Sequence, residues 1–519
     1  MVRKARGGKG KKVAKKGILI EAEMPHQATM PKGSADEYVI KEGELEAKVS
    51  IEKVEGMGRV YRLEVPQWEK GTSAFMEDLK AELLRKVPIT TQEALNIKMA
   101  QQLREKFLEY GRDIIRENMP HLNSRQIDLI ARGIVHEMLG LGDIEFLLKD
   151  DWIEEICING AQIPVWVYHR KHGWIPTDIT ISTENQVWNY ASSIARGVGR
   201  QINTQSPLLD AYLPTGDRVN ATLFPISYFG NTITIRKFAR KPWTITDYIK
   251  LKTINSEVAA LLWLAVQYET NIIVSGGTGS GKTSLLNVMA MFIPQNQRVV
   301  SIEQTREITL PEHLQWVPLV VREPTSEKTG EVGMLDLMVN SLRMRPDRII
   351  VGEIRRADEA QVLFEAMHTG HSVNATLHAE TVSETVRRLV NPPLDIAPVM
   401  MESLHLIISA YRDRRSNIRR VYEVGEIVPS DREGVKANII YRWRPFRDEL
   451  DASEPSVRLL ESIKNYANMD DDDIKRNLKE KQEILDWMVQ KDISSVEEVG
   501  KIISRYYDNP AAVLEMVRQ

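Results

Sequence analysis

The stretch Ile272-Ile273-Val274-Ser275-Gly276-Gly277-Thr278-Gly279-Ser280-Gly281-Lys282-Thr283-Ser284-Leu285 decides the fold of the largest part of this chain. Its opening apolar residues predict a short buried strand, and its glycines predict a tight turn. The residues from Thr283 to Phe292 predict a helix with an apolar face, which ends before Pro294. The segment Gly276–Thr283 fits the pattern G-x-x-x-x-G-K-[ST] in full. The strand before it and the helix after it therefore indicate a phosphate-binding loop.

The chemistry of this loop predicts that the chain binds ATP with Mg²⁺. Glycines let several backbone N–H groups approach one polyphosphate, and the helix N-terminus adds positive potential. Lys282 is expected to reach the β- and γ-phosphates, and the Thr283 hydroxyl is expected to hold Mg²⁺. The alternative is a glycine-rich turn without a ligand. The residues predicted to contact the nucleotide are Gly276, Gly277, Thr278, Gly279, Ser280, Gly281, Lys282, Thr283 and Ser284.

The composition indicates a multidomain protein of ordinary charge. The chain has 519 residues, 42% of them hydrophobic, and its net charge of -3 gives no general bias toward nucleic acid. Cys157 is the only cysteine, which excludes an intramolecular disulfide and a cysteine zinc cluster. No apolar run approaches the roughly 20 residues that span a bilayer, and Val258–Val266 reads as a buried helix. We expect a cytoplasmic protein that acts on a membrane through its partners.

Composition and periodicity divide the chain into six segments. The basic tail would be disordered, and would either be solvated or touch anionic lipid or nucleic acid. In the N-terminal domain the clearest strand is Arg59–Val65, and Asn123 is expected to cap a helix over Arg125–Leu139. The predicted segments are a tail at 1–16, a mostly helical domain at 17–140, an α+β domain at 141–240, a linker at 241–253, a phosphate-loop domain at 254–429 and a helical C-terminal region at 430–519.

The phosphate-loop domain is predicted to contain a doubly wound parallel sheet. Strands expected at Arg298–Ile302, Arg348–Val351 and Ser372–Leu377 alternate with helices, as in α/β folds. Ligands of such sheets bind at the carboxyl ends of the strands. Because Glu303, Glu353 and His378 each follow a strand, we expect them to meet the phosphate loop at one sheet edge.

These strand-end residues suggest specific roles in phosphoryl transfer, which needs positioning and charge neutralisation. Glu353 is expected to act on the waters of Mg²⁺ or on the attacking water, unless it only pairs with Arg355 or Arg356. Glu303 and Glu307 are expected to order water or metal, unless they are solvated loop charges. His378 is expected to sense the γ-phosphate, whereas a structural role is favoured for His371.

The motifs together resemble the traffic ATPases of type II and type IV secretion and type IV pilus assembly, in particular the archaeal branch. Besides the phosphate loop there is an acidic box, a Walker B box and a histidine box. The stretch GLGDIEFLLKDDWIEEICING, then LPTGDRVNATLFP and TITIRKF, also looks like the family's second domain. The three boxes are IEQTREI at 302–308, LRMRPDRIIVGEIR at 342–355 and MHTGHSVNATLHA at 367–379, and the resemblance runs from about 140 to 427.

The resemblance implies a RecA-like motor domain, a hexameric ring, and ATP bound between the motor domain and the preceding domain. It also implies that arginines of the preceding domain reach the phosphates. The matching positions are Arg218 and Arg236, with Arg200 as a weaker candidate. The alternative for Arg236 is a salt bridge to a neighbour. Arginine suits this role because it stays charged and its fork contacts two oxygens.

The sequence departs from the family pattern at two points. The chain lacks the tetracysteine zinc module of many bacterial type II members, and Gln304 stands where relatives often have Asp. The function implied is an ATP-driven motor for secretion or for assembly of pilin-like fibres, peripheral to the cytoplasmic membrane. Its partners would be a polytopic membrane platform protein and pilin-like cargo machinery, with no stable nucleic acid. The alternatives are a conjugation-type motor for DNA or protein transfer, and a nucleotide-gated scaffold that does not hydrolyse ATP.

Overall fold

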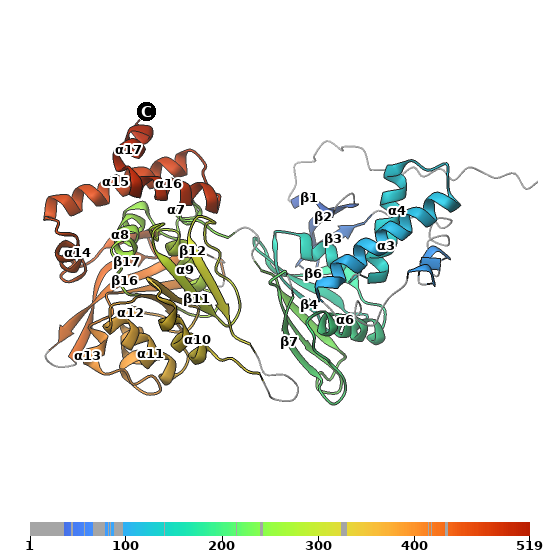
Figure 1. Cartoon of the computed structure of the whole chain (residues 1–519), viewed down its shortest axis with the longest axis horizontal. Helices are drawn as coiled ribbons and strands as arrows, with labels where there is room; N and C mark the ends of the chain where they lie inside the picture. The colour runs from blue at the N-terminus through green and yellow to red at the C-terminus, as the bar shows by residue number, and fades with distance from the viewer. Residues whose placement is uncertain are drawn as a thin grey trace, which may run out of the picture. The chain divides into compact units, whose positions relative to one another are not determined.

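The computed structural model describes residues 36–42, 45–56, 58–65, 78–80, 82–83, 85–87, 97–139, 141–213, 215–238, 242–322, 330–413, 415–416, 418–430 and 434–518. The predicted basic tail at 1–16 lies outside these residues. The chain separates into two compact units, one made of residues 1–88 and 104–149 and the other of 89–103 and 150–519. Figure 1 labels many of the elements of both units. Within the described residues, no helix is both long and apolar enough to cross a membrane.

The first unit contains a three-stranded antiparallel sheet and helices. Its sheet is a meander in which the middle strand pairs with both others. The strand expected at 59–65 is confirmed, with Tyr61 and Leu63 buried on its inner face. The predicted cap is also confirmed, because Asn123 Oδ1 accepts the backbone N–H of Gln126 at 2.9 Å. The elements are β1 (Asp36–Glu42), β2 (Leu45–Val54), β3 (Gly58–Glu64), α3 (Ile97–Asn118), α4 (Ser124–Leu139) and α5 (Ile144–Lys149). The beginning of α3, residues 97–103, is grouped with the second unit.

The second unit begins with antiparallel strands in the order β6-β5-β4-β9-β8-β7. Two of these strands are absent from the sequence prediction. Strand β6 carries Pro176 and strand β7 carries Asp210, and both residue types are unfavourable in strands. The elements are β4 (Ile153–Ile158), β5 (Pro164–His169), β6 (Gly173–Thr180), α6 (Glu184–Gly197), β7 (Leu208–Tyr212), β8 (Arg218–Thr222) and β9 (Thr232–Arg236).

The rest of the second unit is built on a nine-stranded sheet in the order β12-β11-β13-β14-β10-β15-β16-β17-β18. The strands from β12 to β15 are parallel, and those from β15 to β18 are antiparallel. The predicted parallel sheet is therefore confirmed, with β12 as an additional edge strand. The strands are β10 (Ile272–Gly276), β11 (Arg298–Glu303), β12 (Gln315–Val320), β13 (Arg348–Val351), β14 (Ser372–Leu377), β15 (Leu406–Arg412), β16 (Arg419–Ser430), β17 (Gly434–Arg444) and β18 (Glu449–Ala452).

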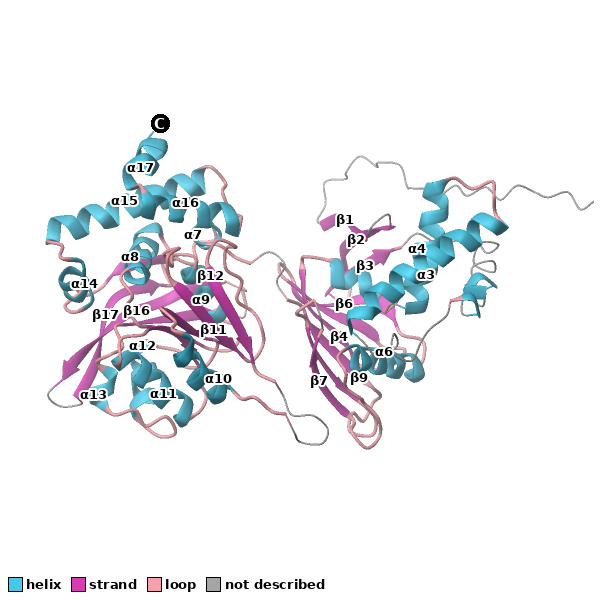
Figure 2. Ribbon diagram, viewed as in Figure 1, coloured by secondary structure: helices cyan, strands magenta, loops and turns pink. Residues whose placement is uncertain are grey.

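Helices cover both faces of this sheet and enclose two hydrophobic cores (Figure 2). On one face α8 is buried along its whole apolar run, Val258–Val266, as predicted. On this face lie α7 (Ile245–Lys250), α8 (Ser256–Gln267), α9 (Lys282–Ala290), α14 (Leu459–Ala467), α15 (Asp471–Gln490), α16 (Val496–Asp508) and α17 (Pro510–Arg518). On the other lie α10 (Met334–Ser341), α11 (Ala357–His368), α12 (Val382–Val390) and α13 (Pro398–Met401), and the single 3₁₀ turn of the described chain, η1 (Leu342–Met344), follows α10.

Two expectations from the sequence are wrong. The segment 434–452, placed in a helical region, forms β17 and β18, because residues such as Ile440 and Trp443 fit a pleated sheet better than a helix. The predicted linker contains helix α7, which starts with a capping box between Thr244 and Asp247. Ile245 of this helix is fully buried in the core, so the segment belongs to the folded domain.

Candidate nucleotide site

The phosphate loop connects β10 to α9 at the carboxyl edge of the parallel strands. Gly276 has a φ of 154°, and a Cβ there would lie 2.4 Å from Ser280 Oγ and 2.5 Å from the Ala410 carbonyl oxygen. Because neither distance is tolerated by a real side chain, this position requires glycine. Gly281, the N-cap of α9, is left-handed and makes no side-chain cap hydrogen bond. The N-cap therefore has no side chain that would compete with an anion for the first N–H groups of α9.

Lys282 is the first residue of α9, and its ammonium group turns back over the loop. Its Nζ donates to the Gly277 carbonyl oxygen at 3.1 Å. Desolvation lowers the pKa of Lys282, while the charges of Glu353 and Glu307 oppose this shift. Both carboxylates therefore lie near enough to favour the charged form of the lysine. A phosphate that enters the loop would replace the carbonyl as its partner.

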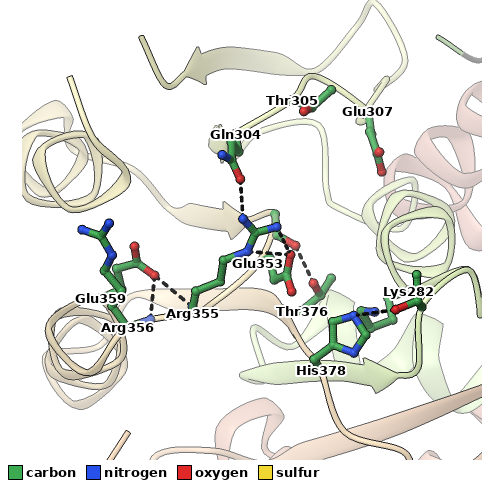
Figure 3. Close-up of polar contacts among 12 residues, drawn as sticks. Lys282, Gln304, Thr305, Glu307, Glu353, Arg355, Arg356, Glu359, Thr376 and His378 are labelled. Atoms are coloured by element: carbon green, nitrogen blue, oxygen red, sulfur yellow. Dashed lines mark hydrogen bonds and ion pairs between the residues drawn. The ribbon is translucent and has the colours of Figure 1, made fainter. Parts of the chain in front are cut away.

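Strand-end side chains meet the phosphate loop at the predicted edge (Figure 3). Glu353 and His378 follow the neighbouring strands β13 and β14, and β14 pairs directly with β10. His378 Nε2 lies 3.3 Å from Thr278 Oγ1 in the loop. Desolvation and the charge of Lys282 lower the pKa of His378, so the neutral imidazole is favoured. His371, by contrast, lies 3.3 Å from the Ala366 carbonyl oxygen, which fits a structural role.

Glu303, at the end of β11, is buried and shapes the loop of the acidic box. Its Oε1 accepts the backbone N–H groups of Glu307 at 2.9 Å and Ile308 at 3.1 Å. Among the described residues, none donates a hydrogen bond to its Oε2. Desolvation raises the pKa of Glu303 to about 7, although the two backbone hydrogen bonds oppose this shift. The unpaired buried oxygen can still accept a hydrogen bond or contact a cation.

The arginines that the resemblance places at the phosphates have different partners. Arg236 at the end of β9 pairs with Glu307 of the acidic box, at 3.1 Å from Nη2 to Oε1. Arg218 donates two hydrogen bonds to Asp210 in its own sheet, at 3.0 and 2.6 Å. Arg200 donates to the Asp210 carbonyl oxygen at 2.6 Å. Of the three, Arg236 is shown in contact with the acidic box of the phosphate-loop domain, through Glu307.

Further contacts of the acidic box were not predicted from the sequence. Thr305 Oγ1 lies 2.7 Å from the Tyr212 hydroxyl oxygen, on strand β7. The guanidinium of Arg306 lies over the rings of Phe238 and Trp316, with its Cζ 6.0 and 5.4 Å from the ring centroids. Together with the Glu307–Arg236 pair, these contacts involve three consecutive residues of the box, 305–307. The motif alone marks the box as acidic but carries no signal for these partners.

Two arginines beside the loop were also missed. Arg412 on β15 and Arg419 on β16 are directly opposite in the antiparallel pair. Arg419 Nε donates to the Gly279 carbonyl oxygen at 3.2 Å. A Cβ on Gly279 would lie 2.7 Å from Arg412 Nη1, so this guanidinium is close to the loop. The only sequence signal is their position in the strand pair that follows the histidine box.

The residues present are compatible with Mg²⁺ bound together with a nucleotide. Within the described part of the chain, no three His, Cys, Asp or Glu side chains are grouped to hold a metal by themselves. Thr283 and Glu353 would supply oxygen ligands, and Mg²⁺ in nucleotide sites takes its other ligands from phosphates and water. A sparse donor set beside an open helix N-terminus thus fits a metal that arrives with its nucleotide.

Comparison with known proteins places these motifs in a family. The family described as "Type II/IV secretion system protein" matches residues 138–415. Uncharacterized protein MJ0900 of Methanocaldococcus jannaschii is 35% identical over 400 residues, which cover 76% of this chain and 72% of that protein. The type IV secretion system protein PtlH of Bordetella pertussis is 30% identical over 323 residues, covering 58% of this chain and 92% of PtlH.

Among solved structures, the VirB11 ATPase of the Brucella suis type IV secretion system is similar at 24% identity. The match covers 54% of this chain and 91% of that chain, with a TM-score of 0.28. The matched segment 138–415, more than half of the chain, contains the phosphate loop and all three boxes. The chain therefore belongs to the type II/IV secretion system protein family.

Proposed function

We propose that this protein is an ATPase motor that powers secretion, or the assembly of pilin-like fibres, at the cytoplasmic membrane. The observation that carries the proposal is the arrangement at one sheet edge. The N-terminus of α9 has a glycine N-cap with no capping side chain, and its first residue, Lys282, lies within electrostatic range of the carboxylate of Glu353. Family membership supports the same reaction, and a glycine-rich turn without a ligand would not need these groups.

Each residue of the edge has a role in the proposed hydrolysis. The N–H groups of the loop and Lys282 bind the β- and γ-phosphates and neutralise their charge. Glu353 orients the attacking water and accepts its proton. His378, held near Thr278, contacts the γ-phosphate and reports its loss. Mg²⁺, held by Thr283 and, through water, by Glu353, would supply further charge neutralisation when bound.

The acidic box is proposed to connect the nucleotide to the preceding domain. Glu303 fixes the loop by its backbone hydrogen bonds, and Glu307 pairs with Arg236. When ATP is bound, the γ-phosphate would compete with Glu307 for this guanidinium. Arg218 would join Arg236 at the phosphates only by breaking its hydrogen bonds to Asp210. This exchange would convert nucleotide binding into a movement of the domain.

The proposed setting is a homo-oligomeric ring, expected to be a hexamer, in the cytoplasm at the membrane surface. The named relative PtlH is a type IV secretion system protein, which supports partners of a secretion machinery. We expect a polytopic platform protein and pilin-like cargo machinery as partners, and no stable nucleic acid. ATP hydrolysis stimulated by DNA would instead favour the conjugation-type alternative.

The test is a comparison of ATP binding and phosphate release in Glu353→Gln. This change keeps the size of the side chain but removes the carboxylate. We expect ATP and Mg²⁺ binding to persist and turnover to fall at least about a hundredfold, as for loss of a water-activating group. The matched control is Glu365→Gln on α11, which should hydrolyse ATP as the wild type does. Binding of ATP by the wild type without turnover would contradict the motor and favour a scaffold.

A further inference from the structure

One arginine joins two motifs of the site. Arg355 donates from Nε and Nη2 to Oε2 of Glu353, at 3.0 and 2.6 Å, and from Nη1 to Oε1 of Gln304 at 2.6 Å. Figure 3 shows the guanidinium between the two side chains. Glu353 belongs to the Walker B box and Gln304 to the acidic box. The expected water-activating carboxylate is thus held by a group of its own chain.

The backbone around Glu353 is fixed on both sides by neighbouring strands. Gly352 N donates to the Ile302 carbonyl oxygen, and Ile354 N donates to the Thr376 carbonyl oxygen, both at 2.9 Å. Because the backbone cannot turn freely, the direction of the Glu353 carboxylate depends on its side-chain partner. The partner seen here is Arg355.

The base of Arg355 is equally fixed. Its backbone N–H donates to Glu359 Oε2 at 2.9 Å, and the N–H of Arg356 donates to the same oxygen at 3.1 Å. Glu359 is itself buried in the first turn of α11. The guanidinium therefore extends from a rigid point and spans the distance between Glu353 and Gln304.

We propose that Arg355 is a positioning residue that holds Glu353 in a resting orientation, and that Gln304 sets the strength of this hold. This inference rests on the proposed ATPase function. Gln304 orients the guanidinium through a neutral oxygen, so Glu353 is the carboxylate to which Arg355 donates. A carboxylate at position 304 would compete for the same charge. Release of Glu353 to the attacking water is then a step that limits basal turnover.

A merely structural ion pair would behave differently. The Arg355 side chain is 58% exposed, and exposed pairs contribute little to stability. If the pair only stabilised the fold, its removal would leave turnover unchanged. If Arg355 instead stabilised the transition state, its removal would reduce turnover. The direction of the change in kcat separates the three roles.

The experiment measures steady-state ATP hydrolysis for Arg355→Gln, Gln304→Glu and the double variant. We expect each single change to raise kcat at least about threefold without a comparable change in KM, because Glu353 is released. In the double variant kcat should equal that of Arg355→Gln, since Gln304 acts through Arg355. Arg355→Lys, which keeps the charge but not the fork, should be intermediate.

The matched control is Arg356→Gln, the neighbouring arginine, which should match the wild type. A lower or unchanged kcat in Arg355→Gln would overturn the proposal, as would an additive effect of Gln304→Glu in the double variant. Arg355→Gln in a Glu353→Gln background should give no gain, and a gain there would also overturn it. The proposed function is judged separately, by whether the wild type hydrolyses ATP at all.

Discussion

Arg218 and Arg236 face each other across the antiparallel pair β8–β9, yet each guanidinium is held by a different carboxylate. Arg218 is held by Asp210 of its own sheet, whereas Arg236 pairs with Glu307 of the acidic box. Two residues that look equivalent in the sequence are therefore engaged differently. Arg236 already has a contact in the loop that borders the nucleotide site.

This relationship predicts that Arg236→Ala leaves ATP affinity only moderately lower but reduces turnover strongly. An arginine that stabilises charge on the γ-phosphate contributes roughly 10³–10⁵ in rate in well-studied GTPases. We expect Arg218→Ala to reduce turnover as well if it leaves Asp210 when ATP binds. The measurement is kcat and ATP affinity for both variants, with the fold checked by circular dichroism. Full activity of both would remove the arginines from the mechanism.

Lys282→Ala should weaken ATP binding and abolish hydrolysis. The change removes the one ammonium group that the loop itself carries, and with it a charge-assisted contact to phosphate. The measurement pairs nucleotide titration with phosphate release. Lys501→Ala, on α16, is a control for the loss of one lysine and should bind ATP normally. Near-normal turnover in Lys282→Ala would show that the phosphate site lies elsewhere.

The burial of Glu303 predicts that the stability of the nucleotide-free protein depends on pH. Burial raises the pKa of Glu303 from an ordinary 4.5 to about 7. Between these two pH values the folded protein keeps a proton on Glu303 that the unfolded protein has lost. Stability therefore falls as pH rises from about 4.5 to about 7, by an amount on the order of 3 kcal/mol for a shift of this size. Above pH 7 Glu303 is ionised in both states, and the full loss of folding stability is present.

Glu303→Gln should remove this dependence, because the amide has no charge to bury. The measurement is hydrogen exchange of the backbone amides of Glu307 and Ile308, which donate hydrogen bonds to Glu303 Oε1. After correction for intrinsic exchange, the variant should be better protected than the wild type at pH 8 and similar at pH 5. Equal protection at both pH values would mean that Glu303 is not protonated near neutral pH.

Assembly into a ring predicts that turnover per subunit rises with protein concentration. Closing a ring brings domains together and completes sites that a lone subunit leaves open. The measurement is a dilution series of ATPase activity beside a particle mass at each concentration. Constant specific activity in a chain that stays monomeric would end the ring prediction.

The sequence by itself determined the phosphate loop and the edge at which the site lies. The loop is readable because the glycine positions follow from local backbone demands, as at Gly276 and Gly281. Glu353 and His378 are readable because parallel strands place their carboxyl ends together. Both inferences depend on short stretches and on one topological rule, so neither needs the rest of the fold.

The strands at the two edges of the sheet and helix α7 are predicted less well from the sequence. Strand β12 forms one edge of the sheet beside β11, and β17 and β18 extend the other edge as successive hairpins from β16. Pro242 favours a linker at this point in the sequence, although the capping residues Thr244 and Asp247 are local signals for helix α7. Helix α16 also starts at a local signal, because the Ser495 side chain accepts the backbone N–H of Glu498 and donates to its carboxylate.

Only the tertiary structure decided which charged groups are joined. Arg355 meets Gln304, 51 positions away in the chain, and Arg236 meets Glu307 across two different sheets. Lys481 is fully buried, with Nζ 5.4 and 4.8 Å from the ring centroids of Trp263 and Tyr506. The physical reason is that a side chain's charge interacts through space over a few ångströms, whereas sequence patterns record only the periodicity of its own element.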